Sequence, residues 1–213
     1  MSINFNSLQS INLFLSQENK NADLLIVSKN QSLEDIETLL SQGYNKFGEN
    51  RVQEAKLKFN KQIRSKYKNL ELHLIGPLQS NKVSIAVQLF DVIQTIDRKK
   101  IIDFIAFEKA KGTIRTNQFY IQVNIGDEKQ KFGVAFECIG GLYEYAQNKK
   151  LNITGLMCIP PNDLNPEKYF KKLFLIREKL NKKLKLSMGM SSDYRIAIEH
   201  NSNLIRVGSK IFS

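Results

Sequence analysis

The stretch DLLIVSKNQSLEDIETLLSQGYNKFG, residues 23–48, decides the fold, because it reads as a strand, a helix and a second strand joined by short links. Residues 23–28 form a short apolar run rich in β-branched side chains. Residues 32–42 repeat apolar side chains at helical spacing, with Ser32 placed to cap the helix and Gly43 placed to end it. The stretch therefore predicts one parallel βα unit.

The same alternation of strand and helix continues along the chain. Short strand, helix and strand with short links are compatible with a closed barrel or an open doubly wound sheet. Eight strands favour closure. The sequence therefore predicts an α/β fold, a (β/α)8 TIM-type barrel, with residues 1–213 as a single domain. The expected strands are residues 23–28, 44–48, 71–76, 91–96, 119–124, 153–159, 184–190 and 203–208.

The two ends of the chain modify the expected barrel. Ser213 follows almost directly on the last predicted strand, so we expect the usual eighth outer helix to be absent. The amphipathic segment at residues 7–16 is expected to cover that gap. The segment PPNDLNP at residues 160–166 is expected to be a surface loop, because it is punctuated by proline.

Composition limits the class of protein. A chain of 213 residues with 42% hydrophobic side chains can bury a substantial core. No apolar run reaches the roughly 20 residues that a membrane-spanning helix needs, so we expect a cytoplasmic protein without membrane contact. The formal charge of +11 is compatible with a nucleic-acid partner, but the basic pairs are dispersed over several segments. Solvated helix faces explain them better.

The cysteines and histidines do not predict a metal site. Cys138 and Cys158 lack CxxC spacing and lie in apolar surroundings, so we interpret both as reduced structural thiols. His73 alternates with leucines in a strand and is expected to be a hydrogen-bonded interior histidine. His200 is expected at a helix end. No cluster of His, Cys and carboxylate has ligand spacing, which argues against a catalytic metal.

Lys29 follows directly on the first predicted strand. Sites in this fold lie at the carboxyl ends of the strands, where we expect Lys29 to be poorly hydrated. Burial lowers the pKa of a lysine and makes the neutral amine available to react with a carbonyl group. The alternative is that Lys29 merely ends a strand in a lysine-rich chain.

Two later strand ends suggest an anion site. The segments GMSSD at residues 189–193 and RVGS at residues 206–209 offer backbone amides and hydroxyls. In such barrels, the loops after strands seven and eight commonly bind phosphate. The alternative is that Ser191, Ser192 and Asp193 only cap the following helix and that Gly208 only ends a strand.

Several long segments resemble the pyridoxal phosphate homeostasis proteins, whose barrel is similar to the N-terminal domain of alanine racemase. The resemblance runs in family order over nearly the whole chain. The matching segments are LLIVSK (24–29), KFGENRVQEAK (46–56), LHLIGPLQSNK (72–82), DVIQTIDR (91–98), IQVNIGDEKQKFGV (121–134), GLMCIPP (155–161), LSMGMSSD (186–193) and RVGSKIF (206–212).

The resemblance implies the cofactor and its contacts. It implies that Lys29 holds pyridoxal 5′-phosphate as a Schiff base and that Asn50 lies beside the cofactor ring. Ser191, Gly208 and Ser209 match the phosphate-binding positions.

The resemblance also implies a role for Arg206 and shows two departures. Arg206 matches the arginine that approaches the pyridine nitrogen, where a permanent cation disfavours protonation of that nitrogen. Arg51 stands where the family often has an aromatic residue, which would alter the rim of the site. Ser213 replaces the usual tail of the family, which leaves this end of the barrel shorter.

The implied function is reversible binding of pyridoxal phosphate, which limits the free aldehyde and supports the supply of cofactor to dependent apoenzymes. We expect a monomer without turnover. The alternative is an amino-acid racemase, which needs proton transfer on both faces of the substrate carbon. In alanine racemase the second acid/base is a tyrosine of another domain, and Tyr194 is not an obvious substitute.

Overall fold

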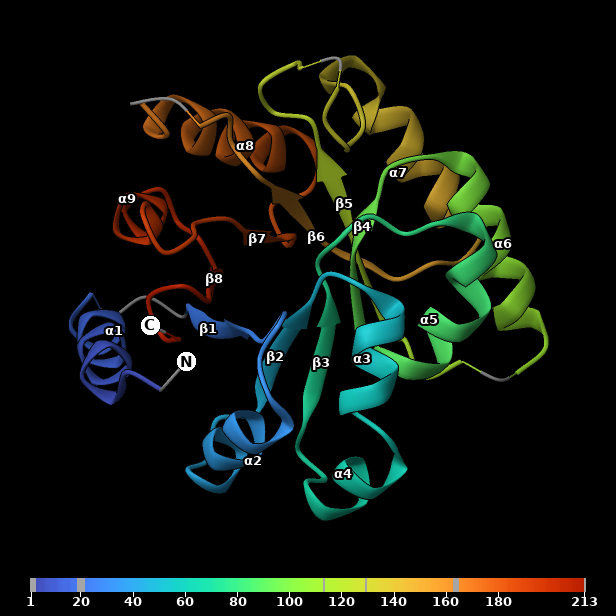
Figure 1. The fold of residues 1–213 in the computed structure, drawn as a ribbon. Helices are drawn as coiled ribbons and strands as arrows, with labels where there is room; N and C mark the ends of the chain where they lie inside the picture. The colour runs from blue at the N-terminus through green and yellow to red at the C-terminus, as the bar shows by residue number, and fades with distance from the viewer. Residues whose placement is uncertain (1–2, 19–21, 113, 129, 163–164, 213) are drawn as a thin grey trace.

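The computed structural model describes residues 3–18, 22–112, 114–128, 130–162 and 165–212. Eight parallel strands form a closed barrel in chain order, and the last strand pairs with the first (Figure 1). Each strand overlaps its predicted segment, so the predicted (β/α)8 barrel is confirmed. The strands are β1 (Asp23–Val27), β2 (Lys46–Glu49), β3 (Glu71–Leu74), β4 (Val92–Ile96), β5 (Gln118–Val123), β6 (Ile153–Cys158), β7 (Lys185–Ser187) and β8 (Leu204–Val207).

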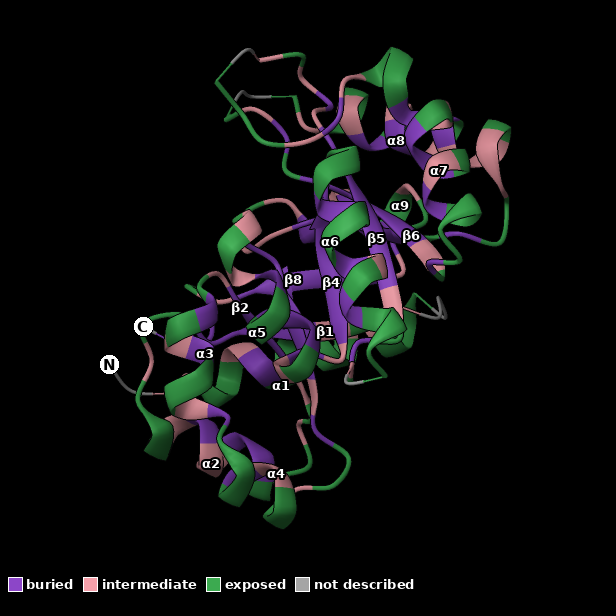
Figure 2. Cartoon of the chain, turned by 90° about the vertical axis from the view of Figure 1, so that its right-hand side faces the viewer, coloured by how far each residue is buried: buried purple, intermediate pink, exposed green. Residues whose placement is uncertain are grey.

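Helices surround the barrel and bury one face each against it. In Figure 2 the strands are buried and the outer faces of the helices are exposed. Ser32 caps α2 as predicted, because its hydroxyl accepts the Asp35 N–H at 3.1 Å. The helices are α1 (Phe5–Gln17), α2 (Leu33–Ser41), α3 (Val52–Lys58), α4 (Lys61–Lys66), α5 (Val83–Leu89), α6 (Lys99–Ala110), α7 (Ile139–Asn148), α8 (Glu167–Leu180) and α9 (Tyr194–Glu199).

The first helix, α1, completes the outer layer between α9 and α2, as the sequence predicted. The Phe14 ring meets the Tyr194 ring of α9 edge-on, with the ring centroids 5.7 Å apart. On the other side, Asn12 donates a hydrogen bond of 2.9 Å to the hydroxyl of Tyr44, just after α2. The Asn4 N–H bonds the carbonyl of Ile211 at 2.7 Å, so the two ends of the described chain lie together.

Two predictions at chain segments fall partly outside the described residues. Residues 160–162 and 165–166 are irregular, as expected for a loop, whereas residues 163–164 lie outside the described part. Ser213, the departure noted at the end of the chain, also lies outside it.

The structure places both histidines as predicted. His200 ends α9 and His73 is buried with hydrogen-bond partners, so both predictions for the histidines are confirmed.

Side chains alternate between the barrel interior and the helix layer along each strand. Leu72 and Leu74 of β3 join the large core between strands and helices, whereas His73 between them points inward. The hydroxyl of Ser187 on β7 donates to Gln94 of β4 at 2.6 Å. Because β4 and β7 are not neighbours in the barrel, this bond crosses its interior. The lumen is therefore filled by polar as well as apolar side chains.

Side chains supplement the seam between β7 and β8, where the backbone ladder is short. Only Ser187 and Leu204 pair in register there among the described residues. The side chain of Asn203 accepts the Leu186 N–H at 2.8 Å, and the Ser202 hydroxyl donates to the Met188 carbonyl at 2.7 Å. These bonds satisfy backbone groups that the ladder leaves unpaired and hold the barrel closed.

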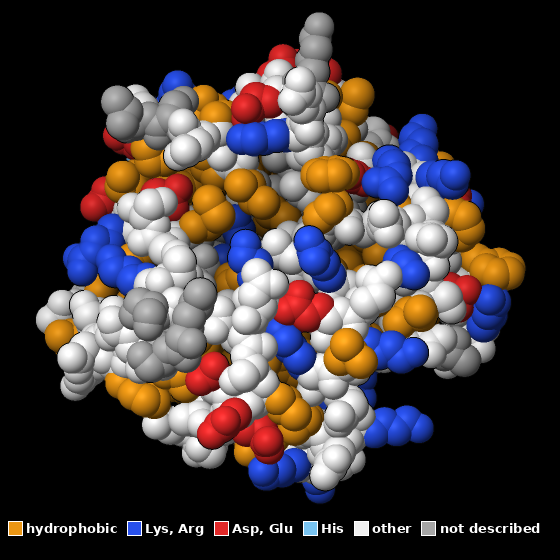
Figure 3. Space-filling model, viewed as in Figure 1, with side chains coloured by type: hydrophobic (Ala, Val, Ile, Leu, Met, Phe, Trp, Pro, Cys, Tyr) orange, Lys and Arg blue, Asp and Glu red, His pale blue; other side chains and the backbone are white. Residues whose placement is uncertain are grey.

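The surface carries no single basic patch on the face shown in Figure 3, where Lys and Arg side chains are spread among Asp and Glu. Among the described residues, no helix is long and apolar enough to cross a membrane.

Both cysteines are free. Cys158 is buried, and burial raises the pKa of its thiol to about 12. The expectation of an apolar environment is wrong for Cys138, which is exposed as the last residue of a short surface turn, Phe136–Cys138, directly before α7.

We expect Gly155→Ala to destabilise the barrel. A Cβ at Gly155 would lie 2.4 Å from Cε2 of Tyr120 and 2.6 Å from the carbonyl oxygen of Lys185, so β6 would have to shift. Overpacking of this kind costs about 1–3 kcal/mol. The matched control is Gly141→Ala in α7, where a Cβ meets nothing within 4 Å. Urea unfolding should show lower stability only for Gly155→Ala, and equal stabilities would contradict the packing argument.

Candidate functional site

A pocket of about 500 Å³ opens at the carboxyl ends of the strands. Its walls come from the segments that follow β1, β2, β3, β6, β7 and β8, together with residues at the ends of β1 and β8. This barrel-top pocket contains every site residue that the sequence predicted, although these residues are dispersed over 180 positions of the chain. The lining residues are Val27, Lys29, Asn50, Ile75, Ile159, Met190, Ser191, Ser192, Arg206, Gly208 and Ser209.

Lys29 lies in the turn after β1, two residues beyond the last strand residue. The expectation that its ammonium is poorly hydrated is wrong, because Lys29 is exposed in the structure. The strand ends at Val27 and the turn carries the side chain past the buried part of the barrel. Its place at the pocket is nevertheless as predicted.

The backbone on both sides of Lys29 is held by charged side chains. The ammonium of Lys58, at the end of α3, donates to the Ser28 carbonyl at 2.7 Å. The carboxylate of Glu54 accepts the Asn30 N–H at 2.5 Å and also binds Lys58 at 2.6 Å. Asn30 has a φ of 61°, a left-handed conformation that these bonds support. The turn that presents Lys29 is therefore anchored from α3.

A buried carboxyl group lies beneath the same turn. Glu49 is fully buried and accepts the Ser28 hydroxyl at 2.8 Å and the Lys58 ammonium at 3.1 Å. Burial raises the pKa of the Glu49 carboxyl, although these bonds and the charge of Lys58 oppose the shift. Sequence reasoning treated this segment as an ordinary strand-to-helix turn and missed the cluster. Two features of the sequence could have indicated this cluster. Glu49 places a carboxylate at the end of a strand, and Glu54 and Lys58 are spaced as an i,i+4 ion pair in the following helix.

Asn50 lies at the pocket because the chain crosses very close to it. A Cβ at Gly76 would lie 2.1 Å from the Asn50 carbonyl oxygen. Only glycine allows this approach between the segments after β2 and β3. Arg51, the residue that departs from the family pattern, is exposed at the start of α3 and is not among the residues that line the pocket.

Arg206 forms part of the pocket wall from inside the barrel and is 3% exposed. Its Nη1 donates to the Ser187 hydroxyl at 2.9 Å, and its Nη2 donates to the Cys158 carbonyl at 2.7 Å. Burial lowers the pKa of the guanidinium. An arginine nevertheless stays cationic in proteins, so the pocket has one fixed positive charge in its wall.

The segments after β7 and β8 offer hydrogen-bond donors. No acceptor among the described residues takes the backbone N–H of Ser191, Ser192 or Ser209. The alternative that side chains here only cap α9 is not supported, because Asp193 makes no capping bond and instead accepts the Met190 N–H at 2.6 Å. That bond shapes the turn and leaves the hydroxyl and amide donors available to an anion.

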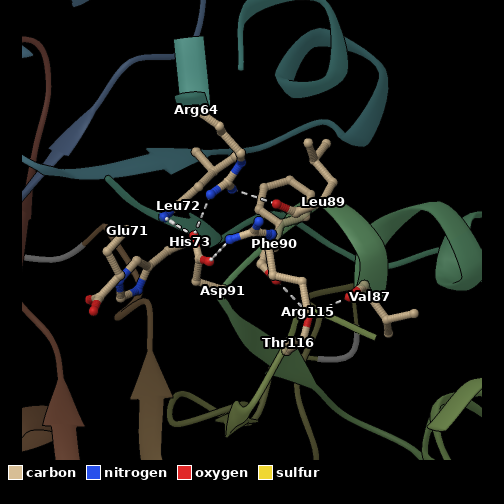
Figure 4. Close-up of polar contacts among 10 residues, drawn as sticks. All are labelled: Arg64, Glu71, Leu72, His73, Val87, Leu89, Phe90, Asp91, Arg115 and Thr116. Atoms are coloured by element: carbon tan, nitrogen blue, oxygen red, sulfur yellow. Dashed lines mark hydrogen bonds and ion pairs between the residues drawn. The ribbon is translucent and has the colours of Figure 1, made fainter. Parts of the chain in front are cut away.

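A second cavity, of about 550 Å³, lies outside the barrel between α3, α4 and α5 and is also basic. The two arginines that line this cavity already form ion pairs within the protein. Arg64 binds Asp91 at 3.0 Å and Arg115 binds the same carboxylate at 3.1 Å (Figure 4). Asp91 also accepts the Leu72 N–H, so this cluster ties α4 to the strands beside it. The barrel-top pocket is therefore the better candidate site.

The barrel-top pocket combines an amine, a buried guanidinium and a group of hydroxyl and amide donors. The amine of Lys29 can attack a carbonyl carbon. The donors around Ser191 and Ser209 suit a phosphate group, and the apolar wall of Ile75, Ile159 and Met190 suits the face of a ring. The site fits a flat, phosphorylated carbonyl compound.

Comparisons with known proteins agree with this geometry. The family model of the alanine racemase N-terminal domain matches residues 11–213. A pyridoxal phosphate homeostasis protein of Haemophilus influenzae is 37% identical over 217 residues, which cover 96% of this chain and 91% of that protein. A protein of the same name from Aquifex aeolicus is 38% identical and is covered over 86% of its length, with 90% of this chain.

Solved structures are similar over nearly the whole chain. The structure of PipY from Synechococcus elongatus with pyridoxal phosphate bound is 30% identical, with a TM-score of 0.85, and the match covers 98% of this chain and 99% of PipY. Alanine racemase from Acinetobacter baumannii shares the fold, with a TM-score of 0.72 at 16% identity; the match covers 99% of this chain and 62% of that enzyme. The chain therefore belongs to the pyridoxal phosphate homeostasis protein family, which is built on the alanine racemase N-terminal domain.

Proposed function

We propose that this chain binds pyridoxal 5′-phosphate reversibly in the barrel-top pocket and acts in pyridoxal phosphate homeostasis and cofactor supply to dependent apoenzymes. The observation that carries the proposal is the convergence of Lys29, Arg206 and the donors around Ser191 and Ser209 on one pocket. The cofactor-bound structure of PipY, a relative covered over 99% of its length, supports it.

In this proposal each residue of the pocket contacts a different part of the cofactor. Lys29 provides the amine to which the aldehyde carbon of the cofactor becomes covalently linked. Ser191, Gly208 and Ser209 hold the phosphate, and Asn50 lies beside the ring. When bound, the cofactor supplies a reactive aldehyde and a ring able to withdraw electrons. Arg206 places a permanent cation at the ring nitrogen and opposes its protonation, which limits that withdrawal.

We expect covalent labelling at Lys29. Protein incubated with pyridoxal phosphate should absorb visible light and, after borohydride reduction, carry one pyridoxyl group on the peptide that contains Lys29. Lys29→Ala should lose the label, whereas Lys100→Ala, which removes an exposed lysine of α6, should keep it. Peptide mass mapping decides the outcome, and a label confined to another lysine would refute the assignment.

We expect the phosphate site to act independently of the covalent link. Ser191→Ala combined with Ser209→Ala should weaken binding of pyridoxine 5′-phosphate, which has no aldehyde, more than Lys29→Ala does. Charge-assisted hydrogen bonds contribute about 1.5–3 kcal/mol each. Calorimetric titration of the three proteins measures the difference.

One further variant sharpens that titration. If the serine double variant binds as tightly as the parent, either the hydroxyls are dispensable beside the backbone amides or the phosphate lies elsewhere. Gly208→Val separates these outcomes, because a side chain there blocks the amide cradle. A Cβ at Gly208 already lies 3.0 Å from the Val27 carbonyl oxygen. Unchanged binding by Gly208→Val would place the phosphate elsewhere.

We expect no racemase turnover with alanine. Racemisation needs an acid or base on each face of the substrate carbon. The described residues that line the pocket include the amine of Lys29 but no carboxyl, imidazole or phenol group to act on the opposite face. Tyr194 instead lies against Phe14 of α1. Chiral chromatography after incubation with L-alanine should find no D-alanine above the buffer control; Lys29-dependent formation of D-alanine would overturn the expectation.

A further inference from the structure

A row of hydrogen-bonded side chains runs through the barrel interior from the barrel-top pocket to the opposite mouth. Arg206 Nη1 bonds the Ser187 hydroxyl at 2.9 Å, and Ser187 bonds the side-chain oxygen of Gln94 at 2.6 Å. The nitrogen of Gln94 lies 2.7 Å from Nδ1 of His73. His73 Nε2 lies 2.7 Å from the carboxylate of Glu71. We call these five residues the lumen chain.

The lumen chain is shielded from water over most of its length. Ser187 and Gln94 are fully buried, and His73 is 2% exposed. Glu71 begins β3, where its side chain is 35% exposed, and Figure 4 shows it beside His73. Because polar groups buried in this way are costly unless every donor meets an acceptor, the direction of each bond matters.

The two ends of the lumen chain fix that direction. A guanidinium can only donate, so Ser187 Oγ accepts from Arg206 and its own proton goes to the Gln94 oxygen. At the other end an ionised carboxylate can only accept, so His73 Nε2 carries the proton shared with Glu71. The pKa of Glu71 is lowered chiefly by this hydrogen bond, against its burial, and further by the charges of Lys46 and Lys185.

The directions of the hydrogen bonds at the two ends determine the direction of the bond between Gln94 and His73 in the middle of the lumen chain. With its proton on Nε2, the neutral ring of His73 offers a bare Nδ1, which accepts an N–H of Gln94. The Gln94 amide cannot turn over without setting its oxygen against Nδ1 and its N–H₂ against the Ser187 hydroxyl. Every bond therefore points from Arg206 toward Glu71, and the orientation of one residue determines the next.

We propose that His73, Gln94 and Ser187 are positioning residues that hold the guanidinium of Arg206 in one orientation at the wall of the barrel-top pocket. The ligand they serve is the cofactor of the proposed function, on which this inference rests. The Cys158 carbonyl holds Nη2 at 2.7 Å, so the lumen chain fixes the second nitrogen and with it the plane of the group. A rigid cation loses less conformational entropy when a ligand binds beside it.

The first test needs no ligand. In ¹⁵N-labelled protein at neutral pH, long-range ¹H–¹⁵N spectra should show His73 with its proton on Nε2 and a bare Nδ1. The Nη protons of Arg206 should give separate, slowly exchanging signals. A proton on His73 Nδ1 would contradict the direction of the lumen chain, and averaged Nη signals would contradict a fixed guanidinium.

The second test breaks the lumen chain at Gln94. Gln94→Met keeps the volume but removes both hydrogen bonds, so the Arg206 Nη signals should average. Binding of pyridoxine 5′-phosphate should weaken about three- to tenfold, the size of one neutral hydrogen bond. The matched control is Gln122→Met, which replaces another lumen glutamine, 6% exposed, whose amide donates to the Phe132 carbonyl outside the lumen chain. Control and parent should agree in both measurements.

A rescue variant separates positioning from packing. Gln94→Glu restores an acceptor for Ser187 and sets a second carboxylate against His73, so it should restore separate Arg206 signals and give His73 a proton on both Nδ1 and Nε2. If Gln94→Met fails to fold, Ser187→Ala removes the bridging hydroxyl with little change in volume and should give the same averaging. Retention of separate Nη signals and of parent affinity in the broken variants would overturn the proposal.

The two proposals fail in different ways. If the parent protein does not bind pyridoxine 5′-phosphate, the proposed function fails, while the Arg206 and His73 spectra still decide whether the lumen chain positions the guanidinium. If the parent binds the ligand and Gln94→Met changes neither spectra nor affinity, the positioning role fails and the proposed function stands.

Discussion

The structure depends on the burial of one positive charge inside a closed barrel. Arg206 is almost fully buried, and among the described residues no carboxylate lies within ion-pair distance of it, although the charge of Asp193 still acts on it. A hydroxyl and a backbone carbonyl hold its two terminal nitrogens. Burying a charge without a partner costs several kcal/mol. The barrel accommodates it by filling its lumen with polar side chains whose bonds all run in one direction. The wall of the pocket therefore carries a fixed cation that solvent does not screen.

The turn that carries Lys29 is held by a different arrangement. Lys29 is exposed, but the peptide groups on either side of it are fixed by Lys58 and Glu54 from α3. Glu49 supports the same turn from below. The backbone is thus held while the side chain of Lys29 stays exposed. Arg206 lies in β8 and Lys29 in the turn after β1, so barrel closure between β8 and β1 brings them to the same pocket.

The fold alone does not separate this chain from enzymes. It shares its barrel with alanine racemase at 16% identity, a likeness that concerns the fold and not the activity. The described lining residues include one amine and one guanidinium but no carboxyl, imidazole or phenol group. This composition is the basis on which we propose cofactor binding and not proton transfer on two faces of a substrate.

The sequence by itself determined the eight strands, the approximate limits of α1 and α2, and the placing of the six candidate site residues at strand ends or just beyond them. Strand and helix periodicities are local, and a parallel barrel brings every strand end to one mouth, so order along the chain was enough. Only the tertiary structure decided that Lys29 is exposed, that Cys138 lies at the surface and that Glu49 joins Lys58. It also decided that Ser187 meets Gln94 across the lumen. Such contacts depend on the register and closure of non-neighbouring strands, which no local pattern in the chain encodes.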